Sequence, residues 1–129
     1  MNESTPAALS NEVAFTVFSV SDMTRSREFY TRILGLTETA NWQDMWVEYD
    51  IGTATLALTK ASEEMPVGGT GVMIGLEVPD LDASIEMLKA RGGVPTGDPW
   101  DSPACRGQRV DDPDGYALLL HKRKEQSPL

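Results

Sequence analysis

Few side chains in this sequence can transfer a proton or act as a nucleophile. His121 is the only histidine and Cys105 the only cysteine among 129 residues. An imidazole titrates near neutral pH, so His121 with Glu48 or with Cys105 would suit acid–base chemistry or thiol activation. Structural interpretations compete with this one. His121 fits an exposed strand end equally well, and Cys105 fits a small buried filler better than a nucleophile.

These residues belong to a chain that repeats itself. Residues 18–36 align with residues 76–94 at a constant offset of 58 positions. Each copy contains a strand pattern, an aspartate able to cap a helix, an amphipathic helix and a glycine stop. The matching positions include Asp22 with Asp80, Ser26 with Ser84, and Gly35 with Gly93. The repeat predicts a fold made of two equivalent units.

Shorter strand patterns follow each predicted helix. In the first copy they cover residues 45–51 and 55–59, and in the second residues 108–110 and 116–121. The second pair is separated by Asp112-Pro-Asp-Gly115, in which proline presets φ and glycine accepts a positive φ. One such unit cannot bury both faces of its sheet. We therefore predict an α+β fold in which two copies share one trough.

The boundaries between the copies follow from composition. We place the first module at residues 11–62, a linker with one proline and two glycines at residues 63–70, and the second module at residues 71–124. A chain of 129 residues fits one compact domain that contains both modules.

Charge and hydropathy exclude several classes of partner. Twenty acidic residues against 11 basic ones give a net charge of −9, which argues against binding to nucleic acid. No apolar run is long enough to span a membrane, and the first ten residues lack a secretory signal. A single cysteine excludes an internal disulfide framework. We expect a soluble protein of the cytoplasm.

Several motifs together resemble the vicinal-oxygen-chelate superfamily, which includes glyoxalase I, bleomycin-resistance proteins and extradiol dioxygenases. In the first half they are Val20-Ser-Asp-Met-Thr-Arg-Ser-Arg-Glu-Phe-Tyr30 and Leu34-Gly-Leu36. In the second half they are Leu76-Glu-Val-Pro-Asp-Leu-Asp-Ala-Ser84 and Asp112-Pro-Asp-Gly115. The resemblance covers residues 13–123. It implies two tandem βαβββ modules forming an open half-barrel trough for a small ligand, and homodimers are common in the superfamily.

Enzymes of this superfamily usually hold a divalent metal with two side chains from each module. The corresponding positions in this sequence are Phe15, Ala57, Met73 and Leu119. None of these side chains offers the nitrogen or oxygen donor that such a metal requires. The resemblance thus points to a member without the usual metal ligands, and we expect no cofactor. Metal-dependent glyoxalase or dioxygenase activity is disfavoured accordingly.

Strand alternation indicates which side chains line the trough. If Phe15 faces inward, an apolar floor results, with polar groups toward its ends. The floor is formed by Phe15, Trp46, Met73 and Leu119, and the polar groups are Glu48, Glu77 and His121. An apolar hollow with a few polar anchors is typical of a small-molecule site.

Three functions compete for this site. The first is binding of a small organic molecule without a metal, as in drug sequestration, where the carboxylates suit a cationic ligand. The second is a lyase, isomerase or dioxygenase of the same superfamily that uses His121 with Glu48 or Cys105. The third is a non-standard metal site formed by His121, Glu48 and Glu77, which must then converge on one ion.

Overall fold

The computed structural model describes residues 6–10, 12–69 and 71–124. The first module consists of β1 (Thr16–Val20), α1 (Met23–Glu28), η1 (Phe29–Ile33), β2 (Thr37–Trp42), β3 (Trp46–Ile51) and β4 (Ala54–Lys60). The second consists of β5 (Met73–Glu77), α2 (Leu81–Ala90), β6 (Pro95–Asp101), β7 (Cys105–Asp111) and β8 (Ala117–Arg123). Within the described residues, no helix is long and apolar enough to cross a membrane.

The two modules have the same topology. The strand order is β1-β4-β3-β2 in the first sheet and β5-β8-β7-β6 in the second, and in each the first strand pairs parallel to the last. The remaining pairs are antiparallel. This confirms the predicted α+β class with two tandem βαβββ modules and with open sheets that do not close into a barrel. Strands β1 and β5 each form an edge of their sheet.

Both helices begin at the predicted aspartates. The side chain of Asp22 accepts a hydrogen bond from the N–H of Arg25 at 3.0 Å, and that of Asp80 accepts one from Ala83 at 3.1 Å. Each bond satisfies a backbone donor that the first helical turn leaves free. The first helix ends differently from the second, because it widens into the π-helical turn η1 before Gly35, whose φ is +72°.

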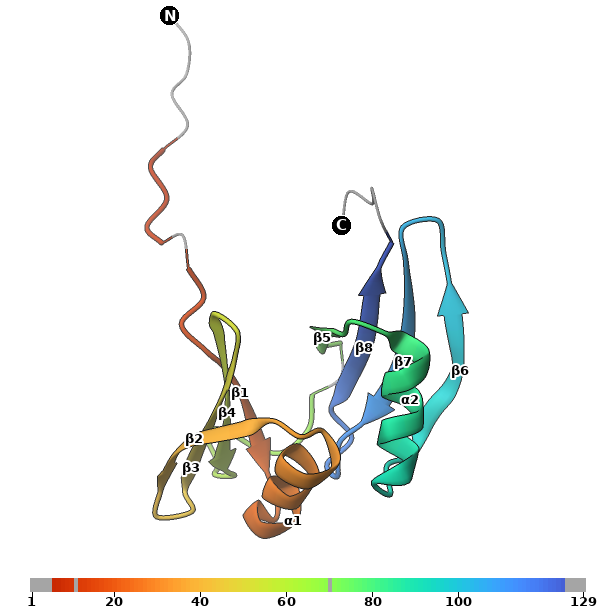
Figure 1. Ribbon diagram of the computed structural model, residues 1–129. Coiled ribbons are helices and arrows are strands. Elements are labelled where there is room, and N and C mark those ends of the chain that lie inside the picture. The colour runs from red at the N-terminus through yellow and green to blue at the C-terminus, as the bar shows by residue number, and fades with distance from the viewer. Residues whose placement is uncertain (1–5, 11, 70, 125–129) are drawn as a thin grey trace, which may run out of the picture.

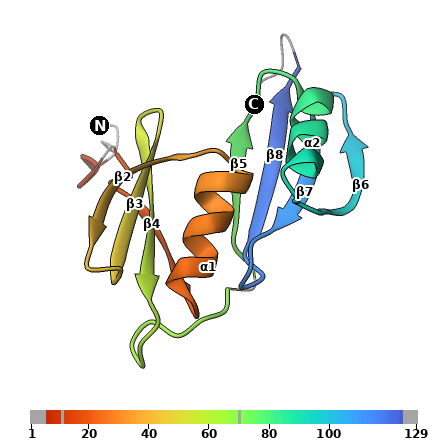
Figure 2. The ribbon, with the colours of Figure 1, turned by 60° about the horizontal axis from the view of Figure 1, so that its bottom comes forward.

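One hydrophobic core joins the modules. It is made by the helix-facing side chains of both sheets together with residues of α1, η1 and α2. Figures 1 and 2 show α1 between the two sheets and α2 across the face of the second. The modules meet where the ring of Phe18 stacks on Tyr116, with centroids 4.2 Å apart. Because the shared core lies on the helix side, the opposite face of each sheet points away from it.

Candidate functional site

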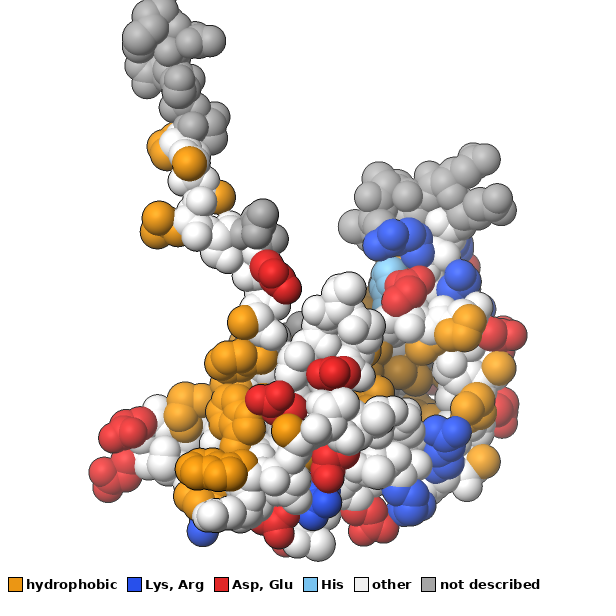
Figure 3. Space-filling view, turned by 60° about the vertical axis from the view of Figure 1, so that its left-hand side comes forward, with side chains coloured by type: hydrophobic (Ala, Val, Ile, Leu, Met, Phe, Trp, Pro, Cys, Tyr) orange, Lys and Arg blue, Asp and Glu red, His pale blue; other side chains and the backbone are white. Residues whose placement is uncertain are grey.

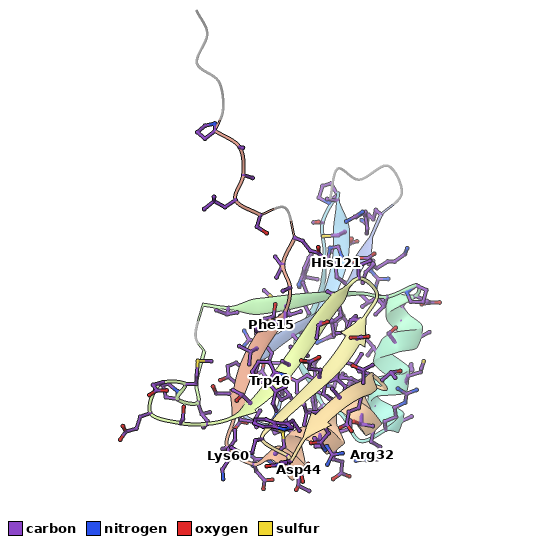
Figure 4. The ribbon with its side chains drawn as sticks, turned by 90° about the vertical axis from the view of Figure 1, so that its left-hand side faces the viewer. Phe15, Arg32, Asp44, Trp46, Lys60 and His121 are labelled. Carbon is purple, nitrogen blue, oxygen red and sulfur yellow. The ribbon has the colours of Figure 1, made fainter. Side chains whose placement is uncertain are left out.

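The first sheet presents an aromatic cluster on the face away from the core. The ring of Phe15 meets Trp46 edge-on, with centroids 5.5 Å apart and planes at 86°. The indole Nε1–H of Trp46 donates a hydrogen bond to Glu48 Oε2 at 2.7 Å. Trp46 and Glu48 lie two residues apart on β3, so their side chains share a face. Figure 4 shows Phe15 and Trp46 close together on the sheet face turned toward the viewer.

This cluster lies at the surface. Phe15 is 49% exposed and Trp42, at the end of β2, is 64% exposed. The space-filling view in Figure 3 shows hydrophobic side chains gathered on this side of the molecule. Several exposed aromatic side chains around one carboxylate are typical of a binding surface. The carboxylate of Glu48 is the polar group that the cluster offers.

The second sheet carries a histidine–carboxylate pair on its corresponding face. Parallel pairing of β5 with β8 sets Glu77 beside His121. His121 Nδ1 lies 2.5 Å from Glu77 Oε1, and the N–H of Arg123 donates to Glu77 Oε2 at 2.7 Å. The backbone bond from Arg123, and to a smaller extent the bond to His121, hold the pKa of Glu77 below its usual value. The carboxylate therefore stays charged beside the imidazole at neutral pH.

An indole lies next to this pair. Gly107 on β7 pairs with His121 across the antiparallel ladder and with Trp100 on β6. A Cβ built on Gly107 would come within 2.5 Å of Trp100 Cζ2 and 3.1 Å of Leu119 Cδ1. The indole therefore occupies the place of the missing side chain and lies against Leu119. The sequence pattern suggested for Trp100 a loop position at the rim or in a dimer contact, whereas the structure places it on β6 beside Gly107.

The candidate site residues are divided between the two sheets. Phe15, Trp46 and Glu48 lie on or beside the first, and Met73, Glu77, Leu119 and His121 on the second. The fold therefore places His121 next to Glu77, and Glu48 lies on the other sheet. Cys105 is buried with its Sγ 3.7 Å from Ser102 Oγ, and it pairs across the ladder with Arg123.

The positions used for metal binding in this fold do not offer suitable ligands. Ala57 pairs with Val17 in the first module just as Leu119 pairs with Gly75 in the second, so the two positions are equivalent. Methyl and isobutyl groups cannot coordinate a divalent ion. Among the described residues, no three His, Cys, Asp or Glu side chains come close enough together to hold one. The residues at the usual place do not fit a metal.

Two hollows border these residues, one on the second sheet and one between the sheets. One of about 460 Å³ is bordered by Met73 and Ala117 of the second sheet, by Arg109 and by the glycines that precede β5. Another of about 190 Å³ lies between the start of β4 and the strand β5, with Thr55 and Glu77 in its lining. Both lie near the candidate residues, and the larger is of the size that small-molecule sites have.

The fold and these faces define a protein of two βαβββ modules whose sheets are open on the side away from the helices. A profile described as "Glyoxalase/Bleomycin resistance protein/Dioxygenase superfamily" matches residues 12–120, and the chain belongs to that superfamily. A "Probable lactoylglutathione lyase" of Vibrio cholerae is 26% identical, covering 89% of this chain and 93% of that protein. An uncharacterised protein of Mycolicibacterium smegmatis is 29% identical, covering 86% and 93%.

Solved structures share the same fold. TnmS3, described as an antibiotic binding protein from Streptomyces sp. CB03234, has a TM-score of 0.78 at 24% identity, covering 92% of this chain and 100% of that one. A glyoxalase/bleomycin resistance protein/dioxygenase from Nocardioides has a TM-score of 0.77 at 23% identity, covering 95% and 91%. At these identities the likeness is one of fold.

Proposed function

We propose that this protein binds a small aromatic molecule with a cationic group, without a metal, and so sequesters a drug-like compound. The observation that carries the proposal is the cluster of Phe15, Trp46 and Glu48. Its rings offer apolar and cation–π contact. The Trp46 indole donates its hydrogen bond to one oxygen, Oε2, of the Glu48 carboxylate. The description of TnmS3 as an antibiotic binding protein supports this class of ligand.

We further propose that the working form is a homodimer. The two faces that carry candidate residues both point away from the core of one chain, so a single copy does not enclose a ligand between them. Met73 on the edge strand β5 is 54% exposed, an apolar surface that a second copy would cover.

A metal-dependent lyase is the less well supported function. The relative from Vibrio cholerae is described as a probable lactoylglutathione lyase, but the identity is 26%. Phe15, Met73 and Leu119 stand where a hard metal would need nitrogen or oxygen ligands. The donor set thus favours binding over metal-assisted chemistry.

The experiment is a titration with ethidium, a planar aromatic cation, followed by isothermal calorimetry. The wild-type protein should bind it, and Glu48→Gln should weaken binding about ten-fold, which corresponds to roughly 1.4 kcal/mol. Glu86→Gln, which removes an exposed carboxylate on α2, is the matched control and should change nothing. Failure of the wild type to bind ethidium, or equal binding by Glu48→Gln, would overturn the proposal.

A further inference from the structure

We propose that His121, Glu77 and Trp100 form a second recognition site, which binds an aromatic ring bearing an acidic hydroxyl and accepts that hydroxyl's proton. This inference rests on the proposed function, because it specifies a chemical group that the small-molecule ligand carries. It concerns the second sheet, whereas the Phe15–Trp46 cluster lies at the first.

Glu77 fixes the orientation of the imidazole. His121 Nδ1 faces a carboxylate oxygen of Glu77 at 2.5 Å, and a carboxylate only accepts hydrogen bonds. In the neutral ring Nδ1 therefore carries the hydrogen and Nε2 carries the lone pair. The other oxygen of Glu77 is held by the N–H of Arg123 at 2.7 Å, so the carboxylate cannot turn away without losing a bond. The pair presents Nε2 as an acceptor.

Trp100 lies on the same sheet face as His121. The side chain of His121 is 17% exposed, so ligand can still reach it. On the adjoining strand the Trp100 indole lies over Gly107, directly across the ladder from His121, and against Leu119. Trp100 and His121 pair with Gly107 from opposite sides, so a ligand ring stacked on this indole would lie over the same sheet face as the imidazole. The geometry therefore selects a flat ring with a hydrogen-bond donor at its edge.

Charged groups of neighbouring strands surround this pair. The carboxylate of Glu77 from β5 faces the imidazole, and Arg123 lies two residues along β8. On β7, Arg109 pairs with Leu119 rather than with His121, and its Nε is bonded to Asp111 at 2.7 Å. On the β6 side, Asp101 is paired with Lys124 at 2.6 Å. Glu77 can keep its hydrogen bond to Nδ1–H in either protonation state of the ring, whereas Arg109 is already paired with Asp111. A phenol suits this arrangement, because its O–H bond breaks, the proton passes to Nε2, and a phenolate remains beside the imidazolium.

The test uses 4-nitrophenol, whose visible absorbance reports its ionisation, and 4-nitroanisole, which has the same ring without the proton. The wild-type protein should bind 4-nitrophenol at least ten-fold more tightly than 4-nitroanisole and should increase the phenolate absorbance. Glu77→Gln should lose most of this preference, and Glu86→Gln should keep it. Equal binding of the two compounds by the wild type would overturn the inference.

A second measurement does not depend on binding. His121 is the only histidine, so the imidazole signals in a ¹⁵N NMR spectrum belong to it. The neutral ring should carry its hydrogen on Nδ1 in the wild type and should lose this preference in Glu77→Gln. An Nε2–H tautomer in the wild type would contradict the arrangement. Binding of ethidium without preference for 4-nitrophenol would reject this inference alone, whereas loss of ethidium binding would reject the proposed function.

Discussion

The hydroxyl of Tyr30 donates a hydrogen bond to Asp112 Oδ2 at 2.7 Å, and this bond links the two modules inside the core. Tyr30 comes from η1 and Asp112 from the turn between β7 and β8. The other oxygen of Asp112 accepts the N–H groups of Asp114 and Tyr116 at 2.9 and 2.8 Å. Burial raises the pKa of Asp112, and the bonds to it counteract that rise. The aspartate of the turn motif thus fixes one module against the other.

Removing the Tyr30 hydroxyl should destabilise the protein. Tyr30→Phe leaves a buried carboxylate oxygen without its donor, and we expect a loss of about 1–3 kcal/mol in the free energy of unfolding. Tyr49→Phe is the matched control, because its hydroxyl bonds to Thr31 at 3.2 Å within the first module. It should cost less. Urea unfolding of both variants measures the difference. Equal losses in the free energy of unfolding would show that the Tyr30–Asp112 bond contributes no more than the Tyr49–Thr31 bond.

The buried hydroxyl of Tyr30 should make the protein less stable at alkaline pH. Burial raises the pKa of Tyr30 above its usual value, and the neighbouring Asp112 charge adds to the effect. Above about pH 10 the unfolded chain ionises this tyrosine while the folded chain keeps the proton. The stabilising contribution is therefore complete below that pH and is lost as the pH rises. Tyr30→Phe should flatten the alkaline limb of a stability profile, and an unchanged limb would contradict the assignment.

The contact between the helical segments of the two modules should not tolerate an added methyl group. A Cβ on Gly93 would lie 2.6 Å from Leu88 Cδ1 and 2.9 Å from Ile33 Cγ2. We expect Gly93→Ala to cost about 1–3 kcal/mol through overpacking. Gly75→Ala on β5 is the control, since nothing lies within 4 Å of its Cβ position. Thermal unfolding distinguishes the two, and a neutral Gly93→Ala would reject this packing.

Much of the fold follows from local chemistry that the sequence displays. The capping aspartates, the Asp112–Gly115 turn and the alternation of β1 and β8 are each encoded within a few residues, and they predicted both modules. The strands β2 and β6 were not located. In β6 the reason is Pro95, Gly97 and Pro99, which are unfavourable in strands. The π-helical turn η1 was missed as well, since its sequence continues the pattern of α1.

The site was less predictable because its geometry depends on pairings distant in sequence. His121 meets Glu77 through the parallel register of β5 and β8, across 44 residues. Its alternative partner Glu48 lies on the other sheet. The side chains expected to line the trough could be named from alternation, but which of them touch depends on how the sheets are placed.

The position of Trp100 should depend on the absence of a side chain at residue 107. Gly107→Ala would push the indole away from the second sheet, and we expect its fluorescence to shift to the red as it becomes more exposed. The signal of Trp100 is obtained by subtracting the spectrum of Trp100→Phe in each background. Gly75→Ala should leave it unchanged. A spectrum of Gly107→Ala identical to that of the wild type would mean that the indole does not depend on this glycine.

The proposed dimer should depend on the exposed face of the second sheet. Met73→Asp places a charge on that face and should convert the dimer to a monomer in sedimentation velocity experiments. Met87→Asp is a close control, because Met87 is 49% exposed on α2, away from the sheet faces. It should leave the dimer intact. A monomeric wild type, or dissociation by the control alone, would contradict the proposed arrangement.

The most direct test of the account is native mass spectrometry of the protein as purified without chelators. One spectrum reports the number of subunits, any bound metal and any small molecule carried through purification. We predict a dimer that carries an organic molecule and no stoichiometric metal. A metal bound at one per site would contradict the account and would direct attention to Glu48, Glu77 and His121 as ligands.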